Sequence, residues 1–378
     1  MQQIAMSWLA YRLTGSVLLL ATITLMSQAP ILFLTPFTSV LADRFNRKTI
    51  LLFTQSLSML QAFLLGYLTL TGLIEIYHIL LLSLFLGCVN TLDNPARQSF
   101  YPTLIDKKEI SNAIALNSAI INGSRLIGPA IGGFVIGLIG EGWCFIANGI
   151  SFIGVIGALC LIRPRAQQRT MAPTGIIKGM HEGLVYIKKN PSISKLLLMM
   201  CSISFFGLPL TTFIPAYTKD ILNGGSEMLG ILMACTGAGS LLAAFYLALH
   251  KDTTRLVKEI SVSCALLGII LSVLSYTQHA WIAAALLISA GFTIIAAAAS
   301  INTLLQVHTT DEMRGRVMGY MAMTFTGVNP LGSMFLGALE ESWGLPAIIL
   351  LSGVACFVSA ILFAGYHKVL SIISPMKI

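Results

Sequence analysis

The basic residues of this chain fall into short clusters separated by long apolar runs, and this pattern constrains the fold more than any other feature. In membrane proteins Lys and Arg concentrate in loops on the cytoplasmic side. Between consecutive clusters lie two apolar spans joined by a turn that is nearly free of basic residues. The pattern therefore predicts a multi-pass protein of the cell membrane with both termini in the cytoplasm. Twenty of the 23 Lys and Arg residues belong to the clusters Arg44/Arg47/Lys48, Arg97/Lys107/Lys108, Arg163 to Lys195, Lys251/Arg255/Lys258, Arg314/Arg316 and Lys368/Lys377.

The composition agrees with a membrane protein. Apolar residues make up 56% of the chain, charged residues 10%, and the mean hydropathy is +0.84. Runs long enough to cross about 30 Å of hydrocarbon recur along the chain, and such runs must be helical because lipid offers the backbone no hydrogen bonds. The sequence pI is near 9.2. Cytoplasmic loops and anionic lipid head groups explain this positive charge, so we expect no nucleic-acid partner.

Twelve helices are expected, near residues 1–12, 17–41, 49–71, 77–100, 111–140, 143–162, 193–216, 227–249, 257–277, 280–305, 317–340 and 344–365. The expected fold class is all-α and polytopic, with an N-terminal six-helix bundle over 1–162 and a C-terminal one over 193–378. The longest polar stretch, 163–192, is predicted to be a cytoplasmic linker with an amphipathic piece around Ile176 to Lys189. The first helix would span only about half of the bilayer before Arg12, at roughly 1.5 Å per residue.

The two halves show weak internal similarity. At an offset of 200 residues the matches are Thr103/Thr303, Leu104/Leu304, Gly132/Gly332, Gly137/Gly337, Glu141/Glu341 and Trp143/Trp343. Together with the charge map they favour a duplicated bundle, which is the arrangement of many secondary transporters.

Two local motifs connect the chain to a known family. The segment 39–48 reads Ser-Val-Leu-Ala-Asp-Arg-Phe-Asn-Arg-Lys, and it resembles the G-x-L-A-D-R-x-G-R-K signature of the major facilitator superfamily. The segment 123–133 is similar to the G-x-x-x-G-P-x-x-G-G element of the exporters in that superfamily. The runs from Asp93 to Gly133 and from Asp311 to Met318 resemble the branch that contains enterobactin-type siderophore and macrolide exporters. The resemblance covers nearly the whole chain.

This resemblance implies a cytoplasmic gate. The motif carboxylate, Asp43, is expected near the start of helix eleven, and the motif Arg47 is expected to contact Asp93 in helix four. Arg44, Lys48 and Arg97 complete the candidate gate. The alternative is that these cations only set topology. Ser39 and Asn46 stand where the signature has glycines, and the equivalent loop of the second half, His250 to Thr253, has lost the pattern.

Arg125 is the candidate for the transport cavity or for coupling. It lies midway along helix five, where a charge costs about 2.5–3.5 kcal/mol on insertion scales, so it should face water, an anion or a fixed partner such as Asp93. Asn90 and Asn94 are further cavity candidates. The same helix carries the exporter element, whose small residues are interpreted either as helix-packing positions or as part of the transport machinery. Its members are Gly123, Gly128, Pro129, Gly132 and Gly133.

The predicted function is secondary active export of a small organic molecule by alternating access, with protons as the coupling ion and a monomer in the bilayer. No cofactor or metal site is expected, because the seven cysteines are scattered singly and no phosphate-binding GxxxxGK[ST] loop occurs. A membrane enzyme is disfavoured by the lack of HExxH, GxSxG or paired intramembrane aspartates. A non-transporting, truncated descendant such as a sensor, and a lipid-translocating member of the same fold, remain alternatives.

Overall fold

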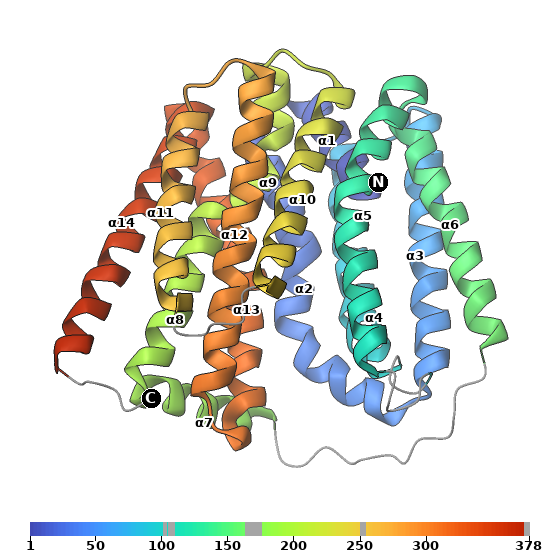
Figure 1. Cartoon of the computed structure of the whole chain (residues 1–378). Helices are drawn as coiled ribbons and strands as arrows, with labels where there is room; N and C mark the ends of the chain where they lie inside the picture. The colour runs from blue at the N-terminus through green and yellow to red at the C-terminus, as the bar shows by residue number, and fades with distance from the viewer. Residues whose placement is uncertain (101–103, 105–109, 163–175, 250–254, 374–378) are drawn as a thin grey trace. The chain divides into compact units, whose positions relative to one another are not determined.

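The chain is helical throughout the part that the structure, a computed structural model, describes: residues 1–100, 104, 110–162, 176–249 and 255–373 (Figure 1). The helices of its first part are α1 (Gln2–Thr14), α2 (Val17–Arg44), α3 (Arg47–Leu70), α4 (Ile76–Phe100), α5 (Ile110–Ile139) and α6 (Glu141–Leu161). Those that follow are α7 (Ile176–Lys189), α8 (Pro191–Ser202), η2 (Ile203–Gly207), α9 (Pro209–Ala216), η3 (Tyr217–Ile221), α10 (Ser226–Leu249), α11 (Leu256–Leu274), α12 (Ala280–His308), α13 (Asp311–Trp343) and α14 (Leu345–Ile373).

Each of the twelve predicted spans corresponds to a helical segment. Among the described residues, eight of these segments are long and apolar enough to cross a membrane, and two shorter apolar stretches lie within α2 and α5. α1 has 13 residues, in agreement with a first helix shorter than a full span. α13 begins at Asp311, six residues before its predicted start, because the polar Asp311-to-Arg316 segment forms its first turns.

The chain divides into two compact units, which we describe separately. The first comprises Met1–Gly175 and Gly224–Ile231, and the second comprises Ile176–Asn223 and Leu232–Ile378. In the first unit α3 packs between α4 and α6, while α2 packs along α4. In the second unit α11 packs between α12 and α14. The third span of each half thus contacts the fourth and the sixth, as expected for a duplicated bundle. The domain boundaries inferred from the sequence stay a prediction.

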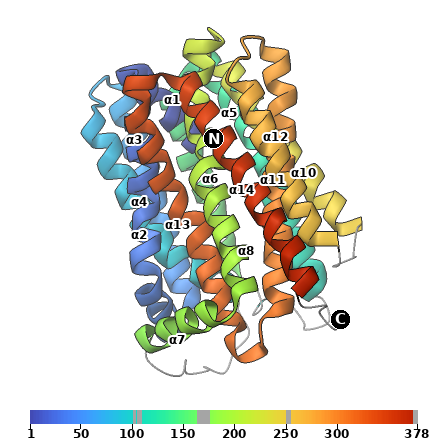
Figure 2. The same cartoon turned by 90° about the vertical axis from the view of Figure 1, so that its left-hand side faces the viewer.

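The predicted amphipathic piece of the linker is α7, which lies across the end of α13 in the second unit (Figure 2). Glu182 forms an ion pair of 2.7 Å with Arg316, and the Tyr320 hydroxyl donates a hydrogen bond of 3.0 Å to the carbonyl of Met180. Gly183 faces the same two α13 side chains, since a Cβ there would lie 3.1–3.2 Å from them. α7 is therefore fixed to the first turns of α13 in its own unit.

The seventh span is longer than its sequence pattern indicates. It runs continuously from Pro191 to Ile221 through two π-helical segments, η2 and η3. Pro209 lies just after the first π-helical segment, and Pro215 lies just before the second. A proline has no backbone N–H to donate, which favours a locally wider turn. The π-helical turns were not predicted, because hydropathy does not distinguish a π from an α turn.

Candidate gate and cavity residues

Asp93 lies in α4 at the end of the first unit where α3 begins. The residue is 4% exposed. One carboxylate oxygen accepts hydrogen bonds from the Thr54 hydroxyl (2.8 Å) and the Gln55 amide (2.7 Å) of α3. The other accepts from the guanidinium of Arg97, one turn along α4, with an Nε distance of 3.0 Å. A buried carboxylate needs such donors to offset the loss of its hydration, so the site ties α3 to α4.

Lys48 makes a second connection at this end of the unit. Its ammonium donates to the carbonyls of Cys160 (3.0 Å) and Ile162 (2.7 Å), at the C-terminus of α6. Carbonyls there have no intrahelical partner, and the helix dipole favours a cation. Asn46 starts α3, since its side chain accepts from the backbone N–H of Lys48 (3.0 Å). This N-cap role explains an asparagine where the family signature has glycine.

The remaining gate candidates are described only in part. The side chains of Ser39, Asp43 and Arg44 lie outside the described residues, as does the second-half loop 250–253. Arg47 is half-buried. The expected contacts of Asp43 with helix eleven and of Arg47 with Asp93 therefore stay predictions.

The glycines of α5 have unequal roles. A Cβ at Gly133 would lie 2.5 Å from the Ser226 carbonyl and 2.6 Å from the Cα of Gly230, at the start of α10. At Gly132 the nearest atom would be the Cα of Met1, at 3.3 Å. Among the described residues, a Cβ at Gly123 would meet nothing within 4 Å, and one at Gly128 would make only an ordinary contact with Met1. Close backbone approach thus explains why position 133 is a glycine and, less strictly, why position 132 is one. Packing does not explain the glycine at position 123.

Arg125 is exposed on α5. At 3.6 residues per turn it shares a helix face with Gly128, Pro129 and Gly132. Of the two asparagine candidates on α4, Asn90 is half-buried and Asn94 is exposed. Asp93 has the three side-chain partners named above. Whether Arg125 faces a cavity stays a prediction.

Two polar connections of the first unit were missed by the sequence reasoning. The Gln2 amide donates to the buried Gln61 (2.7 Å), Asn148 donates to Gln2 (2.5 Å), and Gln61 donates to the carbonyl of Leu82 (3.4 Å). This amide chain joins α1, α3, α4 and α6. At the opposite end from Lys48, Arg12 forms a 2.9 Å ion pair with Glu141 at the first turn of α6. Gln61 and Asn148 stand in otherwise apolar runs, which was the available signal.

The helices of the first unit are thus connected by buried hydrogen bonds, with paired charges at one end and a glycine-rich face on α5. Within the described residues, no group of three or more His, Cys, Asp or Glu side chains could hold a metal ion. The fold is that of an all-helical, multi-pass membrane protein.

Comparison with known families makes the assignment more specific. The sequence model described as a transmembrane secretion effector matches residues 1–370, so the chain belongs to that family, which contains transporters and not enzymes. The Staphyloferrin A transporter of Staphylococcus aureus (strain NCTC 8325 / PS 47) is 26% identical over 98% of this chain and 93% of its own length. The multidrug efflux pump Tap of Mycolicibacterium fortuitum is 23% identical over 92% and 87%. Macrolide efflux protein A of Streptococcus pyogenes is 22% identical over 90% and 85%. The exporter resemblance inferred from the motifs is confirmed.

Solved structures support the same fold. A bacterial homologue of the iron transporter ferroportin, in an inward-facing state, has a TM-score of 0.75 at 13% identity, covering 97% of this chain and 95% of its own. A bacterial homologue of the human lysosomal transporter Spinster has a TM-score of 0.71 at 16% identity, covering 96% and 93%. At such identities the likeness establishes the fold alone.

Proposed function

We propose that this protein is a secondary active transporter that exports a small organic molecule across the cytoplasmic membrane by alternating access, in exchange for protons. The observation that carries the proposal is the match of the secretion-effector family over residues 1–370, together with relatives named as efflux proteins. The positive-inside pattern supports placing both termini and the clusters around Lys48 and Arg97 in the cytoplasm.

The buried carboxylate supports the gating part of the proposal. Asp93 lies at the proposed cytoplasmic end, where it forms an ion pair with Arg97 and accepts hydrogen bonds from two α3 side chains. In one state of the proposed cycle, these contacts of Asp93 keep this end of the first unit rigid. The motif residues Asp43 and Arg47 form and break contacts as the two halves rock. Apart from acids within three residues of a span's end, Asp93 is the one acid inside a sequence-predicted span, so it is also the leading candidate for proton coupling.

Arg125 is the proposed cavity residue. An exposed guanidinium in the middle of an apolar helix is stable only beside water, an anion or a polar partner. Gly128, on the same face of α5, leaves room beside it, because a Cβ there would meet only the backbone nitrogen of Met1, at 3.9 Å. The arrangement suits a substrate with an anionic or amphipathic group.

Transport in inverted membrane vesicles with an imposed pH gradient tests the proposal. We expect gradient-dependent accumulation of at least one substrate from a panel of macrolides and siderophores, and a loss of at least tenfold in Arg125→Ala, the equivalent of about 1.4 kcal/mol. Lys258→Gln, an exposed charge at the start of α11, is the matched control and should transport normally. Transport that survives collapse of the gradient would exclude proton coupling, and normal transport by Arg125→Ala would remove that residue from the mechanism.

A further inference from the structure

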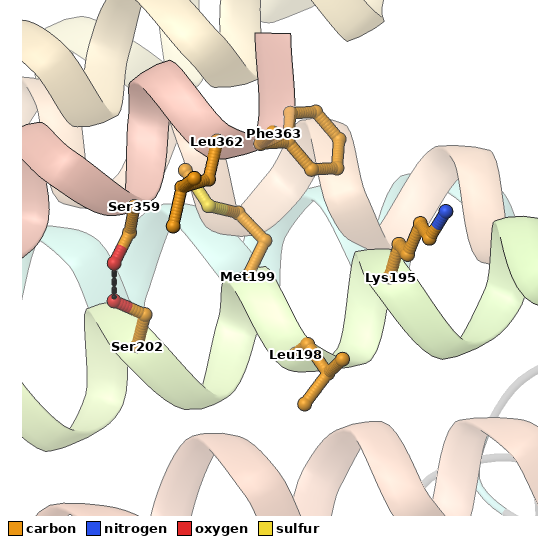
Figure 3. Close-up of a pocket in the computed structure, with 7 residues that line it drawn as sticks. All are labelled: Lys195, Leu198, Met199, Ser202, Ser359, Leu362 and Phe363. Atoms are coloured by element: carbon orange, nitrogen blue, oxygen red, sulfur yellow. Dashed lines mark hydrogen bonds between the residues drawn. The ribbon is translucent and has the colours of Figure 1, made fainter. Parts of the chain in front are cut away.

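Two spanning helices of the second unit, α8 and α14, border a groove of about 310 Å³ (Figure 3). α8 contributes Lys195, Leu198, Met199 and Ser202, which follow the i, i+3, i+4, i+7 spacing of one helix face. α14 contributes Ser359, Leu362 and Phe363, with the same spacing. The groove therefore runs along the two helices instead of crossing them.

The polarity of the groove changes along its length. Lys195 is four residues from the start of α8, about 6 Å into the span. Ser202 lies about 10 Å deeper, and its hydroxyl is 2.7 Å from that of Ser359. Ser359 donates in turn to the carbonyl of Ala355 (2.7 Å). The inner end thus holds hydroxyls that satisfy one another, and Met199, Leu362 and Phe363 occupy the stretch between them and Lys195 (Figure 3).

The groove is open, and the helices that form it belong to apolar spans. α8 starts the span Pro191–Ile221, and the α14 residues lie in the span Leu345–Gly365. Leu198 is 67% exposed and Leu362 is 69% exposed. Such side chains are stable in contact with lipid chains. The groove thus has the character of a lipid-facing surface with a cation near its outer end.

Additional positive charge lies at the same end. Lys188 and Lys189, at the end of α7 and directly before α8, are exposed. Lysines at a membrane surface attract anionic head groups, and their alkyl stems pack along apolar surface while the ammonium stays near the interface. From the membrane surface inwards, the groove presents a cation, then an apolar wall, then an inner end whose polar atoms are all hydrogen-bonded. That order is complementary to one anionic phospholipid.

We propose that the α8–α14 groove is a binding site for an anionic phospholipid, with the phosphate on Lys195 and one acyl chain along Met199, Leu362 and Phe363. The proposal goes beyond the transport function, since the occupant is a lipid of the bilayer and not the exported molecule. The competing occupant, an exported amphiphile, is distinguished by the experiment.

The test is native mass spectrometry of the full chain, equilibrated with phosphatidylglycerol or phosphatidylcholine and then progressively delipidated. We expect one phosphatidylglycerol to be retained in preference to phosphatidylcholine. Lys195→Gln should lower this preference about fivefold, as expected for one lysine at a membrane surface. Leu362→Trp, at an exposed position, should fill the groove and reduce retention of both lipids. Lys258→Gln should behave as wild type, since this exposed lysine begins another span of the same unit, outside the groove.

Three results would overturn the proposal. The first is equal retention of the two lipids by the wild-type protein, and the second is an unchanged preference in Lys195→Gln at an unchanged melting temperature. The third is displacement of the retained lipid by a macrolide at the concentration that saturates efflux, which would assign the groove to exported cargo. Vesicle transport measured on the same variants keeps this outcome separate from failure of the export proposal.

Discussion

Asp93 is a carboxylate in a mostly apolar helix, and its three donors determine what a substitution there would cost. Replacing it with Asn removes the negative charge and leaves Arg97 without its counter-ion. We expect Asp93→Asn to lower the free energy of unfolding in detergent by about 1–3 kcal/mol, because Arg97 loses its ion-pair partner and the amide offers one acceptor oxygen instead of two. Arg97→Gln alone should also destabilise the protein.

A double-mutant cycle separates the ion pair from other effects of these changes. In Asp93→Asn/Arg97→Gln two neutral amides face each other, so the loss should be smaller than the sum of the single losses, with a coupling energy of about 0.5–3 kcal/mol. Arg314→Gln is the matched control, since its partner Asp311 is 88% exposed and the pair should contribute about 0–1 kcal/mol. Strictly additive losses of stability at Asp93 and Arg97 would contradict an energetic coupling between these two side chains.

The sequence singled out Asp93 and Arg97 as gate candidates, but it did not predict their pairing or the two α3 donors to Asp93. An acid inside an apolar run is conspicuous, whereas Thr54 and Gln55 gave no signal because hydropathy does not tell which face of one helix meets another. The same limit hid the Gln2–Gln61–Asn148 chain and the two α6 carbonyls that Lys48 contacts. Contacts of this kind depend on the rotation of each helix about its axis, and only the packed structure determines it.

At the scale of an element, the backbones of α5 and the start of α10 can approach closely because Gly133 and Gly230 have no side chains. A methyl group at Gly133 would overlap backbone atoms, which cannot move aside as a flexible side chain can. We expect Gly133→Ala to separate the two helices, to cost about 1–3 kcal/mol of stability as overpacking does, and to reduce transport.

Gly123→Ala is the internal control for this prediction, because it lies in the same motif and helix but has open space around it. It should melt at or above the wild-type temperature, since alanine favours helix over glycine by up to about 1 kcal/mol. Thermal unfolding in detergent and vesicle transport are the measurements. Equal effects at the two positions would argue that the motif acts through backbone flexibility instead of helix approach.

Helix positions were predictable to within a few residues for most spans, because each is bounded by charged or turn-forming residues. The expected helices 257–277 and 280–305, for example, correspond to α11 (Leu256–Leu274) and α12 (Ala280–His308). The first π-helical segment, from Ile203 to Gly207, was not predictable. It depends on how the helix packs: Phe205 and Phe335 lie with ring centroids 5.6 Å apart, and Ser204 donates to the carbonyl of Phe325 (3.4 Å).

At the scale of the whole molecule, the packing scheme and the charge map repeat in the two halves. The contacts of α3 with α4 and α6 recur as those of α11 with α12 and α14. The basic clusters occupy equivalent connections in both halves, so the positive-inside rule predicts that both bundles have the same orientation in the membrane.

Cysteine labelling in intact cells tests this orientation in each half separately. The parent is a variant without the seven native cysteines, which are unpaired among the described residues. We expect exposed positions in the second connection, Phe45→Cys, and just before α13, Thr310→Cys, to react only after the membrane is permeabilised. Tyr77→Cys and Tyr276→Cys, exposed at the opposite helix ends, should react with an impermeant maleimide from outside. If the two halves gave opposite results, they would be inverted repeats, and the shared orientation on which alternating access is proposed would be lost.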